Sequence, residues 1–206
     1  MSEPGLLIVY SGPSGVGKGT LLRPYLATHP AAALSVSVTT RAPRPGERDG
    51  VDYHFITEEQ FQRLVAEDGL LEHARYNGNG YGTPREAVER QLAAGRDVVL
   101  EIEVQGAMKI KQSFPDAVFV FILPPSYETL RNRLSGRGTE PPEVVEARLA
   151  AAHYELSFAE QYDYVIVNDD LEAAGEKLAA VISAARCRTK NMMWMIERMR
   201  SPHEHA

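Results

Sequence analysis

The chain has 206 residues, 44% of them hydrophobic and 24% charged, an ordinary composition for one globular domain. Its 28 acidic residues outnumber the 22 basic ones, and this balance argues against general binding of nucleic-acid backbone. A single cysteine, Cys187, excludes an intrachain disulfide, and no apolar run reaches the roughly 20 residues that a membrane span needs. The start of the sequence lacks the features of a signal peptide, so we expect a cytoplasmic location.

The first predicted element is a buried strand that leads directly into a glycine-rich turn. Leu6–Tyr10 is apolar and partly β-branched, and a helical pattern begins at Leu21. The N–H groups of such a turn, a helix N-terminus and a lysine together form a phosphate cradle. A glycine-rich turn without a ligand is the alternative, but the flanking strand and helix disfavour it. The residues expected to bind a nucleoside triphosphate are Gly12, Pro13, Ser14, Gly15, Val16, Gly17, Lys18, Gly19 and Thr20.

One position departs from the usual phosphate-loop sequence. The residue after the lysine is normally Ser or Thr, whose hydroxyl ligates Mg²⁺. Here that residue is Gly19, and the hydroxyl comes one position later, at Thr20. We expect phosphate binding to be kept, with Mg²⁺ held by Thr20 either directly or through water.

The middle of the chain predicts short strands separated by turns and one helix. A capping box at Thr57 and Gln60 begins the helix, which ends near Gly69. The sequence Asn77-Gly78-Asn79-Gly80 is a strong turn signal. The strands expected in this region are Leu34–Thr39, Val51–Ile56 and Leu70–Tyr76.

From residue 83 onward, strands alternate with helices. Thr83, Pro84 and Glu86 occupy the N-cap, N1 and N3 positions of a predicted helix that ends at Gly95. Further helices are expected before Phe114, after Ser126, from Pro141 or Pro142, and from Asp170 to about Arg200. The strands expected in this half are Asp97–Ile102, Ala117–Leu123 and Tyr164–Val167.

This order predicts an α/β fold: a parallel doubly wound sheet with a small mixed-sheet insertion and a short lid. We expect a single domain over residues 1–206. Its core comprises about residues 1–34 and 84–206, including a lid at about 136–150, and the inserted lobe comprises about residues 35–83.

A second cluster of residues suggests an acceptor for the phosphate. Arg41 and Arg44 stand on a proline-rich loop, and two guanidinium groups so placed suit a dianionic phosphate. Tyr53 and Tyr81 can each add a hydroxyl donor. Taken singly, solvated arginines and packed tyrosines are the more common outcomes, so the hypothesis depends on these residues acting together.

As an ordered set, these motifs resemble the guanylate kinase family from about Leu6 to Leu171. No single motif is decisive, but their order is specific. The motifs are Gly-Pro-Ser-Gly-Val-Gly-Lys at 12–18, Ser-Val-Thr-Thr-Arg-Ala-Pro-Arg at 37–44, Gly-Val-Asp-Tyr at 50–53, Tyr-Gly-Thr at 81–83, Gln-Gly at 105–106, Gly-Arg-Gly-Thr at 136–139 and Val-Asn-Asp-Asp at 167–170.

The resemblance implies a GMP site in the inserted lobe. It implies that the GMP phosphate is held by Arg41, Arg44, Tyr53 and Tyr81, and the guanine by Ser37, Glu72 and Thr83. The chemistry of Glu72 agrees, because guanine presents N1–H and a 2-amino group side by side to a carboxylate. Adenine has an unprotonated N1 there, which would leave buried polar groups unpaired.

The acids after the strand at 97–102 differ from the family pattern. The family usually has Leu-Asp-Ile-Asp where this chain has Leu100-Glu101-Ile102-Glu103, so both acids are one methylene longer. Glu101 is the implied counterpart of the acid near the acceptor and the metal.

The implied reaction is ATP + GMP = ADP + GDP, with Mg²⁺ bridging the donor phosphates. The resemblance places Lys18, Arg133, Arg137 and Arg148 around the transferring phosphate. No general base is expected, because a phosphomonoester has its second pKa near 6 and is largely deprotonated at pH 7. The implied partners are ATP and GMP, with dGMP as a further acceptor, and neither nucleic acid nor membrane; oligomeric state is left open.

Two alternatives remain from the sequence. A kinase of another small phosphate, such as a ribosyl phosphate, would keep Lys18 but would not need Glu72 as a guanine reader. A non-catalytic guanylate-kinase-like binding module would need neither Lys18 nor the complete set of glycines.

Overall fold

The computed structural model describes residues 3–76, 78–135 and 142–200. The expected loop at 136–139, with Arg137, lies outside the described residues, as do Asn77 of the predicted turn and Pro141. No helix within these three ranges is long and apolar enough to cross a membrane.

The core is a five-stranded parallel sheet in the order β2-β7-β1-β8-β9. Strand β1 lies at its centre: the chain passes from it to β2 at one edge, returns inward to β7 beside β1, and then continues through β8 to β9 at the other edge. This order confirms the predicted doubly wound topology. The strands are β1 (Leu7–Ser11), β2 (Ala32–Leu34), β7 (Asp97–Glu101), β8 (Val118–Leu123) and β9 (Tyr164–Val167).

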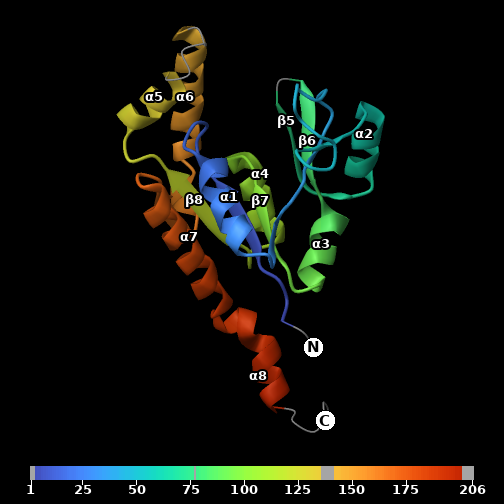
Figure 1. The fold of residues 1–206 in the computed structure, drawn as a ribbon. Helices are drawn as coiled ribbons and strands as arrows, with labels where there is room; N and C mark the ends of the chain where they lie inside the picture. Colours follow the sequence, from blue (N-terminus) through green and yellow to red (C-terminus); the bar gives the residue numbers. More distant parts are fainter. Residues whose placement is uncertain (1–2, 77, 136–141, 201–206) are drawn as a thin grey trace.

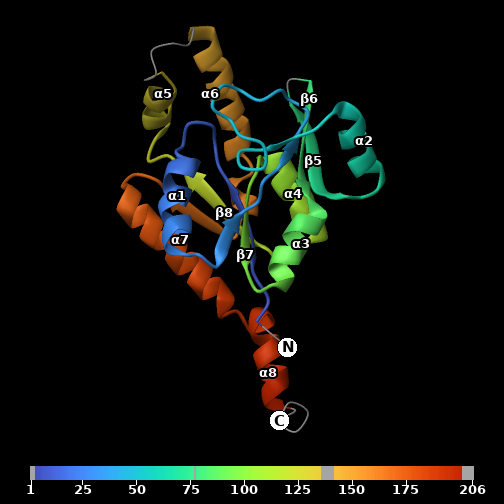
Figure 2. The same cartoon turned by 45° about the vertical axis from the view of Figure 1, so that its right-hand side comes forward.

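Helices cover both faces of this sheet (Figures 1 and 2). Ile8 and Tyr10 of β1 point to α1 (Lys18–Thr28) and α7 (Leu171–Arg186) on one face. Leu7 and Val9 point to the opposite face, where α3 (Arg85–Ala93) and α4 (Val104–Ser113) pack. The alternation follows from the two-residue period of a strand, and burial on both faces explains why β1 is apolar throughout.

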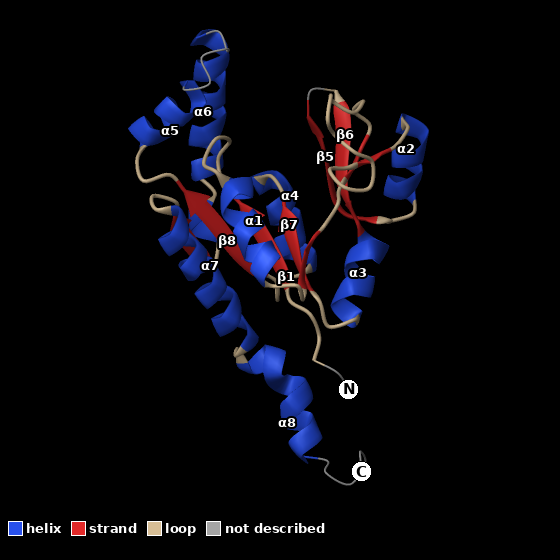
Figure 3. Ribbon diagram, in the orientation of Figure 1, coloured by secondary structure: helices blue, strands red, loops and turns tan. Residues whose placement is uncertain are grey.

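A smaller mixed sheet, in the order β4-β3-β6-β5, stands beside the core (Figure 3). Its β3–β4 pair is parallel, while the β3–β6 and β5–β6 pairs are antiparallel. Helix α2 (Glu58–Ala66) covers it through Phe61, which packs with Val38 and Leu70. The strands are β3 (Val38–Thr39), β4 (His54–Phe55), β5 (Leu70–Tyr76) and β6 (Asn79–Pro84).

Two predicted strands in this region are wrong in their bounds. The single strand expected at Leu34–Thr39 is two strands in different sheets, because β2 pairs with β7 of the core whereas β3 pairs with β4 and β6. The strand expected at Val51–Ile56 shortens to β4. There, Asp49 and Asp52 accept hydrogen bonds from backbone N–H groups, which favours a turn over an extended strand.

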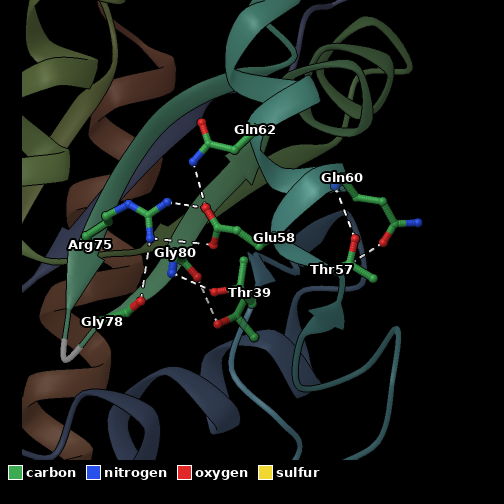
Figure 4. Close-up of polar contacts among 9 residues, drawn as sticks. Thr39, Thr57, Glu58, Gln60, Gln62, Arg75, Gly78 and Gly80 are labelled. Carbon is green, nitrogen blue, oxygen red and sulfur yellow. Dashed lines mark hydrogen bonds and ion pairs between the residues drawn. The ribbon is translucent and has the colours of Figure 1, made fainter.

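Of the two helix N-caps predicted from the sequence, the one at Thr57 is confirmed and the one at Thr83 is wrong. Thr57 and Gln60 form the expected capping box at the start of α2, which Figure 4 shows. At the start of α3 the N-cap is Pro84 rather than Thr83. Strand β6 continues to Pro84, so the Thr83 side chain turns away from the helix and into the site described below.

The C-terminal part also differs from the prediction of one helix from Asp170 to about Arg200. Helix α7 ends at Arg186, a short 3-10 helix covers Thr189–Met192, and α8 covers Met193–Arg200. Cys187 is the C-cap of α7, and Asn191 donates its side-chain amide to the Ala185 carbonyl in the last turn of the helix. Helix α8 then extends away from the core (Figures 1 and 2).

Candidate active site

The glycine-rich turn connects the end of β1 to the start of α1. Gly15 and Gly17 have φ angles of 81° and 92°, in the left-handed region that favours glycine. A Cβ at Gly12 would lie 2.5 Å from the Ile122 carbonyl oxygen, so only glycine lets the turn pass over β8. The backbone therefore curls tightly around a point in front of the N-terminus of α1, as an anion cradle requires.

Lys18 is the first residue of α1, and its ammonium group lies over the turn. Its Nζ donates to the carbonyl oxygens of Gly12 and Pro13, at 2.6 and 3.2 Å. Burial lowers the pKa of Lys18, while the carboxylates of Glu101, Glu155 and Glu103 oppose that shift. The lysine is thus a cation placed at the cradle and balanced by nearby acids.

Arg133 supports the turn from α5 (Tyr127–Ser135). Its guanidinium donates to the carbonyl oxygens of Val16 and Asn168, both at 3.1 Å. The Asn168 side chain donates to the same Val16 carbonyl at 2.8 Å. Asn168 belongs to the quoted Val-Asn-Asp-Asp motif, yet no role followed from the sequence, because its partner lies 152 residues away.

Helix α6 (Pro142–Leu156) contacts Ser14 of the turn at two points. Arg148 donates to the Ser14 hydroxyl at 2.9 Å, and the Glu155 carboxylate accepts from the Ser14 N–H at 3.3 Å. Residues 148 and 155 are two helical turns apart and share one face. Burial raises the pKa of Glu155, against the effect of Lys18. Glu155 was not predicted from the sequence, although its spacing from Arg148 was a usable signal.

A cavity of about 750 Å³ extends from Ser14 to the smaller sheet. It brings residues predicted for the donor and acceptor sides into one space. Further acids and an aromatic residue, Glu103, Glu155 and Tyr154, line it without having been predicted. The predicted residues that line it are Ser14, Ser37, Arg41, Arg44, Tyr53, Glu72, Tyr81, Glu101 and Arg148.

Glu47, which was not predicted from the sequence, organises the arginine loop. Glu47 forms an ion pair with Arg41 at 2.9 Å and accepts from the Arg44 N–H at 2.7 Å. The pKa of Glu47 is lowered, chiefly by its hydrogen bond from Arg41. The Arg41 guanidinium also lies 5.5 Å from the centroid of the Tyr53 ring, which meets Tyr81 edge to face. Arg41, Tyr53 and Tyr81 are therefore held together at one end of the cavity.

The carboxylate of Glu72 is buried, with 7% of the residue exposed. Thr83, fully buried, donates its hydroxyl to Oε1 of Glu72 at 2.7 Å. Burial raises the pKa of Glu72, against the lowering effects of the Thr83 hydrogen bond and the Lys109 charge. An ionised carboxylate has about four lone-pair sites, so Glu72 keeps acceptor capacity for further N–H donors beside Thr83.

The oxygen-bearing side chains near the turn suit a hard cation whose ligands would be mainly phosphate oxygens. Nothing lies within 4 Å of a Cβ built at Gly19, so this position supplies open space rather than a ligand. Thr20 is exposed in the first turn of α1, and Glu101 lines the cavity near Lys18. Among the described residues, no group of three His, Cys, Asp or Glu side chains forms a metal site. Oxygen donors in this arrangement fit Mg²⁺, which keeps several waters and takes one or two protein ligands.

Fold and site together define a class of protein. A parallel sheet with a glycine-rich turn and lysine after its central strand is the architecture of phosphate-loop nucleotide-binding proteins. The cavity adds a second set of anion-binding side chains on an inserted sheet. This combination is that of a kinase acting on a small phosphorylated acceptor.

Comparison with known proteins identifies the family. The family model described as guanylate kinase matches residues 5–185. A guanylate kinase of Desulfitobacterium hafniense is 50% identical over 193 residues, which are 94% of this chain and 96% of the relative. One from Caldanaerobacter subterraneus is 50% identical and covers 91% of each chain. The crystal structure of guanylate kinase from Anaplasma phagocytophilum superposes with a TM-score of 0.76 at 36% identity, covering 98% of this chain and 97% of that one. The chain belongs to the guanylate kinase family, as its motifs suggested.

Proposed function

We propose that this protein transfers the γ-phosphate of ATP to GMP, giving ADP and GDP. The observation that carries the proposal is that Ser14 of the glycine-rich turn lines the same cavity as Arg41, Arg44 and Glu72. A donor triphosphate on the turn and a monophosphate on the arginines would face each other across it. The single-domain organisation with a core, a lobe at 35–83 and a lid at about 136–150 is part of the same proposal.

The acceptor would bind with its phosphate on the arginine loop. Arg41 and Arg44 supply charge, and the hydroxyls of Tyr53 and Tyr81 supply further donors. Glu47 supports this role by holding Arg41 and the Arg44 backbone in place before GMP arrives. Such preorganisation reduces the entropy lost on binding.

The guanine would bind at the buried carboxylate of Glu72. Its N1–H and 2-amino group would donate to the two carboxylate oxygens, with Ser37 and Thr83 beside them. The hydrogen bond from Thr83 fixes Oε1 of Glu72 and so supports a defined orientation of the carboxylate for guanine recognition. An adenine, with an acceptor at N1, would face the carboxylate lone pair against lone pair.

Transfer itself requires positioning and cation density, because the transition state spreads negative charge over the moving phosphoryl group. Lys18 would contact the donor phosphates, and Arg148 would turn from Ser14 toward the transferring group. Arg133 supports the turn through Val16, and Arg137, outside the described residues, is proposed as a further cation. Mg²⁺, held by the phosphates with Thr20 and Glu101 acting directly or through water, would neutralise charge on the donor. No general base is needed, since the acceptor oxygen of a phosphomonoester is largely ionised at pH 7.

A coupled ADP-release assay tests the proposal, with GMP, dGMP, AMP, UMP and CMP offered in parallel. We expect turnover with GMP and dGMP and little with the other three. Equal turnover with AMP would remove Glu72 as the guanine reader. No turnover with any of these acceptors, or turnover of a ribosyl phosphate but not of GMP when the two are compared in the same assay, would overturn the assignment.

A further inference from the structure

Helix α4 of the core packs directly on β5 of the smaller sheet, the strand that carries Glu72. The helix begins at Val104, so Gly106 lies in its first turn, and Gly106 is buried. In an α-helix, glycine is less favourable than alanine because it loses more backbone entropy. A glycine at this buried position therefore needs a packing or functional reason.

The space over Gly106 is occupied by the Glu72 carboxylate. A Cβ built at residue 106 would lie 2.7 Å from Oε2 of Glu72 and 3.1 Å from its Cδ. Real Cβ atoms essentially never approach another heavy atom as closely as 2.7 Å. The two carboxylate oxygens thus have different neighbours: Oε1 accepts from Thr83, and Oε2 lies against the bare α-carbon of Gly106.

A second contact fixes the helix to the same strand. Lys109, one turn after Gly106, donates its ammonium group to the carbonyl of His73, the residue next to Glu72. Positions 106 and 109 lie on one helical face, so both contacts act on adjacent residues of β5. The charge of Lys109 also favours the ionised form of Glu72.

We infer that Gly106 is a positioning residue that sets base specificity: it leaves the room in which the Glu72 carboxylate takes the orientation that reads a purine 2-amino group. This inference rests on the proposed function of Glu72. Reading N1–H and the 2-amino group together requires both oxygens to face the base edge at hydrogen-bonding distance. A methyl group at residue 106 would push Oε2 away and turn the carboxylate plane, while Thr83 retains Oε1.

The test is Gly106→Ala, assayed with GMP and with IMP, which has the N1–H but lacks the 2-amino group. We expect the KM for GMP to rise about 10- to 100-fold with a smaller change in kcat, since misplacement of one group by about an ångström can cost 100-fold. The KM for IMP should change less, so the preference for GMP over IMP should narrow. Equal losses with the two substrates, or an unchanged KM for GMP in a folded variant, would overturn the inference.

A matched control is Gly175→Ala in α7, where the added Cβ would meet only Leu21 at an ordinary 3.9 Å. This variant should keep both KM values and melt no lower than the parent. Glu72→Gln separates the inference from the function on which it rests. If Glu72→Gln loses the preference for GMP and Gly106→Ala keeps it, the inference alone fails. If neither variant changes the preference, the proposed role of Glu72 fails as well.

Lys109→Gln tests the packing of α4 on β5 without adding volume, in case Gly106→Ala fails to fold. Its control is Lys111→Gln on the same helix, because Lys111 also donates to a backbone carbonyl, that of Gln161, away from β5. We expect Lys109→Gln, and not Lys111→Gln, to raise the KM for GMP and to narrow the preference over IMP. Identical kinetics in the two lysine variants would overturn the argument that α4 positions the carboxylate.

Discussion

Replacement of Glu72 by glutamine is the sharpest test of the acceptor site. Glutamine keeps the shape of the side chain and its Oε1, so the Thr83 hydroxyl can still donate to it. Position 72 is buried, and a neutral amide removes the cost of burying a charge there. The variant should therefore fold as well as the parent, and a change in kinetics would report on the base.

The magnitude follows from the hydrogen bonds that the amide cannot make. One guanine N–H would lose a charged acceptor and would instead face the amide N–H₂ group. A hydrogen bond to a charged group contributes about 1.5–3 kcal/mol, and a buried donor left unpaired costs about 1–3 kcal/mol. Because these terms overlap, we expect about 2–4 kcal/mol in total, or about a 30- to 1000-fold loss in kcat/KM for GMP.

The assay is initial-rate kinetics with GMP and AMP at saturating ATP. The loss with GMP should appear mainly in KM, and the gap between GMP and AMP should narrow because the amide can donate to N1 of adenine. Glu67→Gln, an exposed glutamate just after α2, is the matched control and should change neither constant. A Glu72→Gln enzyme with parental kcat/KM for GMP would refute the reasoning.

Three further predictions concern the cation, the carboxyl group and the turn. Lys18→Ala should lower kcat/KM at least about 100-fold in the coupled assay with little change in melting temperature; retained turnover would contradict its role. The KM for GMP should rise as pH falls, beginning above the usual carboxyl range, because burial raises the pKa of Glu72 and only its ionised form accepts both N–H groups. This pH step, measured as the ratio of KM values, should be missing from Glu72→Gln. Glu155→Gln should bind ADP about three- to tenfold more tightly in calorimetry, because a neutral amide competes less for the Ser14 N–H. The exposed Glu160→Gln is its control, and unchanged or weaker ADP binding would contradict this account.

Sequence reasoning succeeded where structure is decided by neighbouring residues. The glycine-rich turn and the Thr57 capping box depend on residues within a few positions, so their patterns can be read directly. The doubly wound sheet also followed, because alternating strands and helices leave few topologies open. The family resemblance, carried by motif order, is confirmed by the comparisons.

Sequence reasoning failed where distant parts of the chain compete to pair with one segment. Alternation across 34–39 indicates extended chain but not which sheet each half joins, and β7 and β6 divide it between them. Thr83 has the local pattern of an N-cap, yet a buried carboxylate 11 residues earlier in the chain takes its hydroxyl. Glu155 shows the same limit, since its helical face is readable from the sequence and the Ser14 backbone opposite it is not.

The contacts at the glycine-rich turn link phosphate binding to the position of helix α6. The Lys18 ammonium group donates to turn carbonyls, and Ser14 is held through its N–H by Glu155 and through its hydroxyl by Arg148. A triphosphate on the turn would use the same Ser14 N–H and the same two cations, so it must exchange these contacts for its own. Since Arg148 and Glu155 lie on one face of α6, that exchange removes both of these polar contacts of the helix with Ser14. A triphosphate that takes the Ser14 N–H and the Arg148 guanidinium therefore competes with α6 for Ser14.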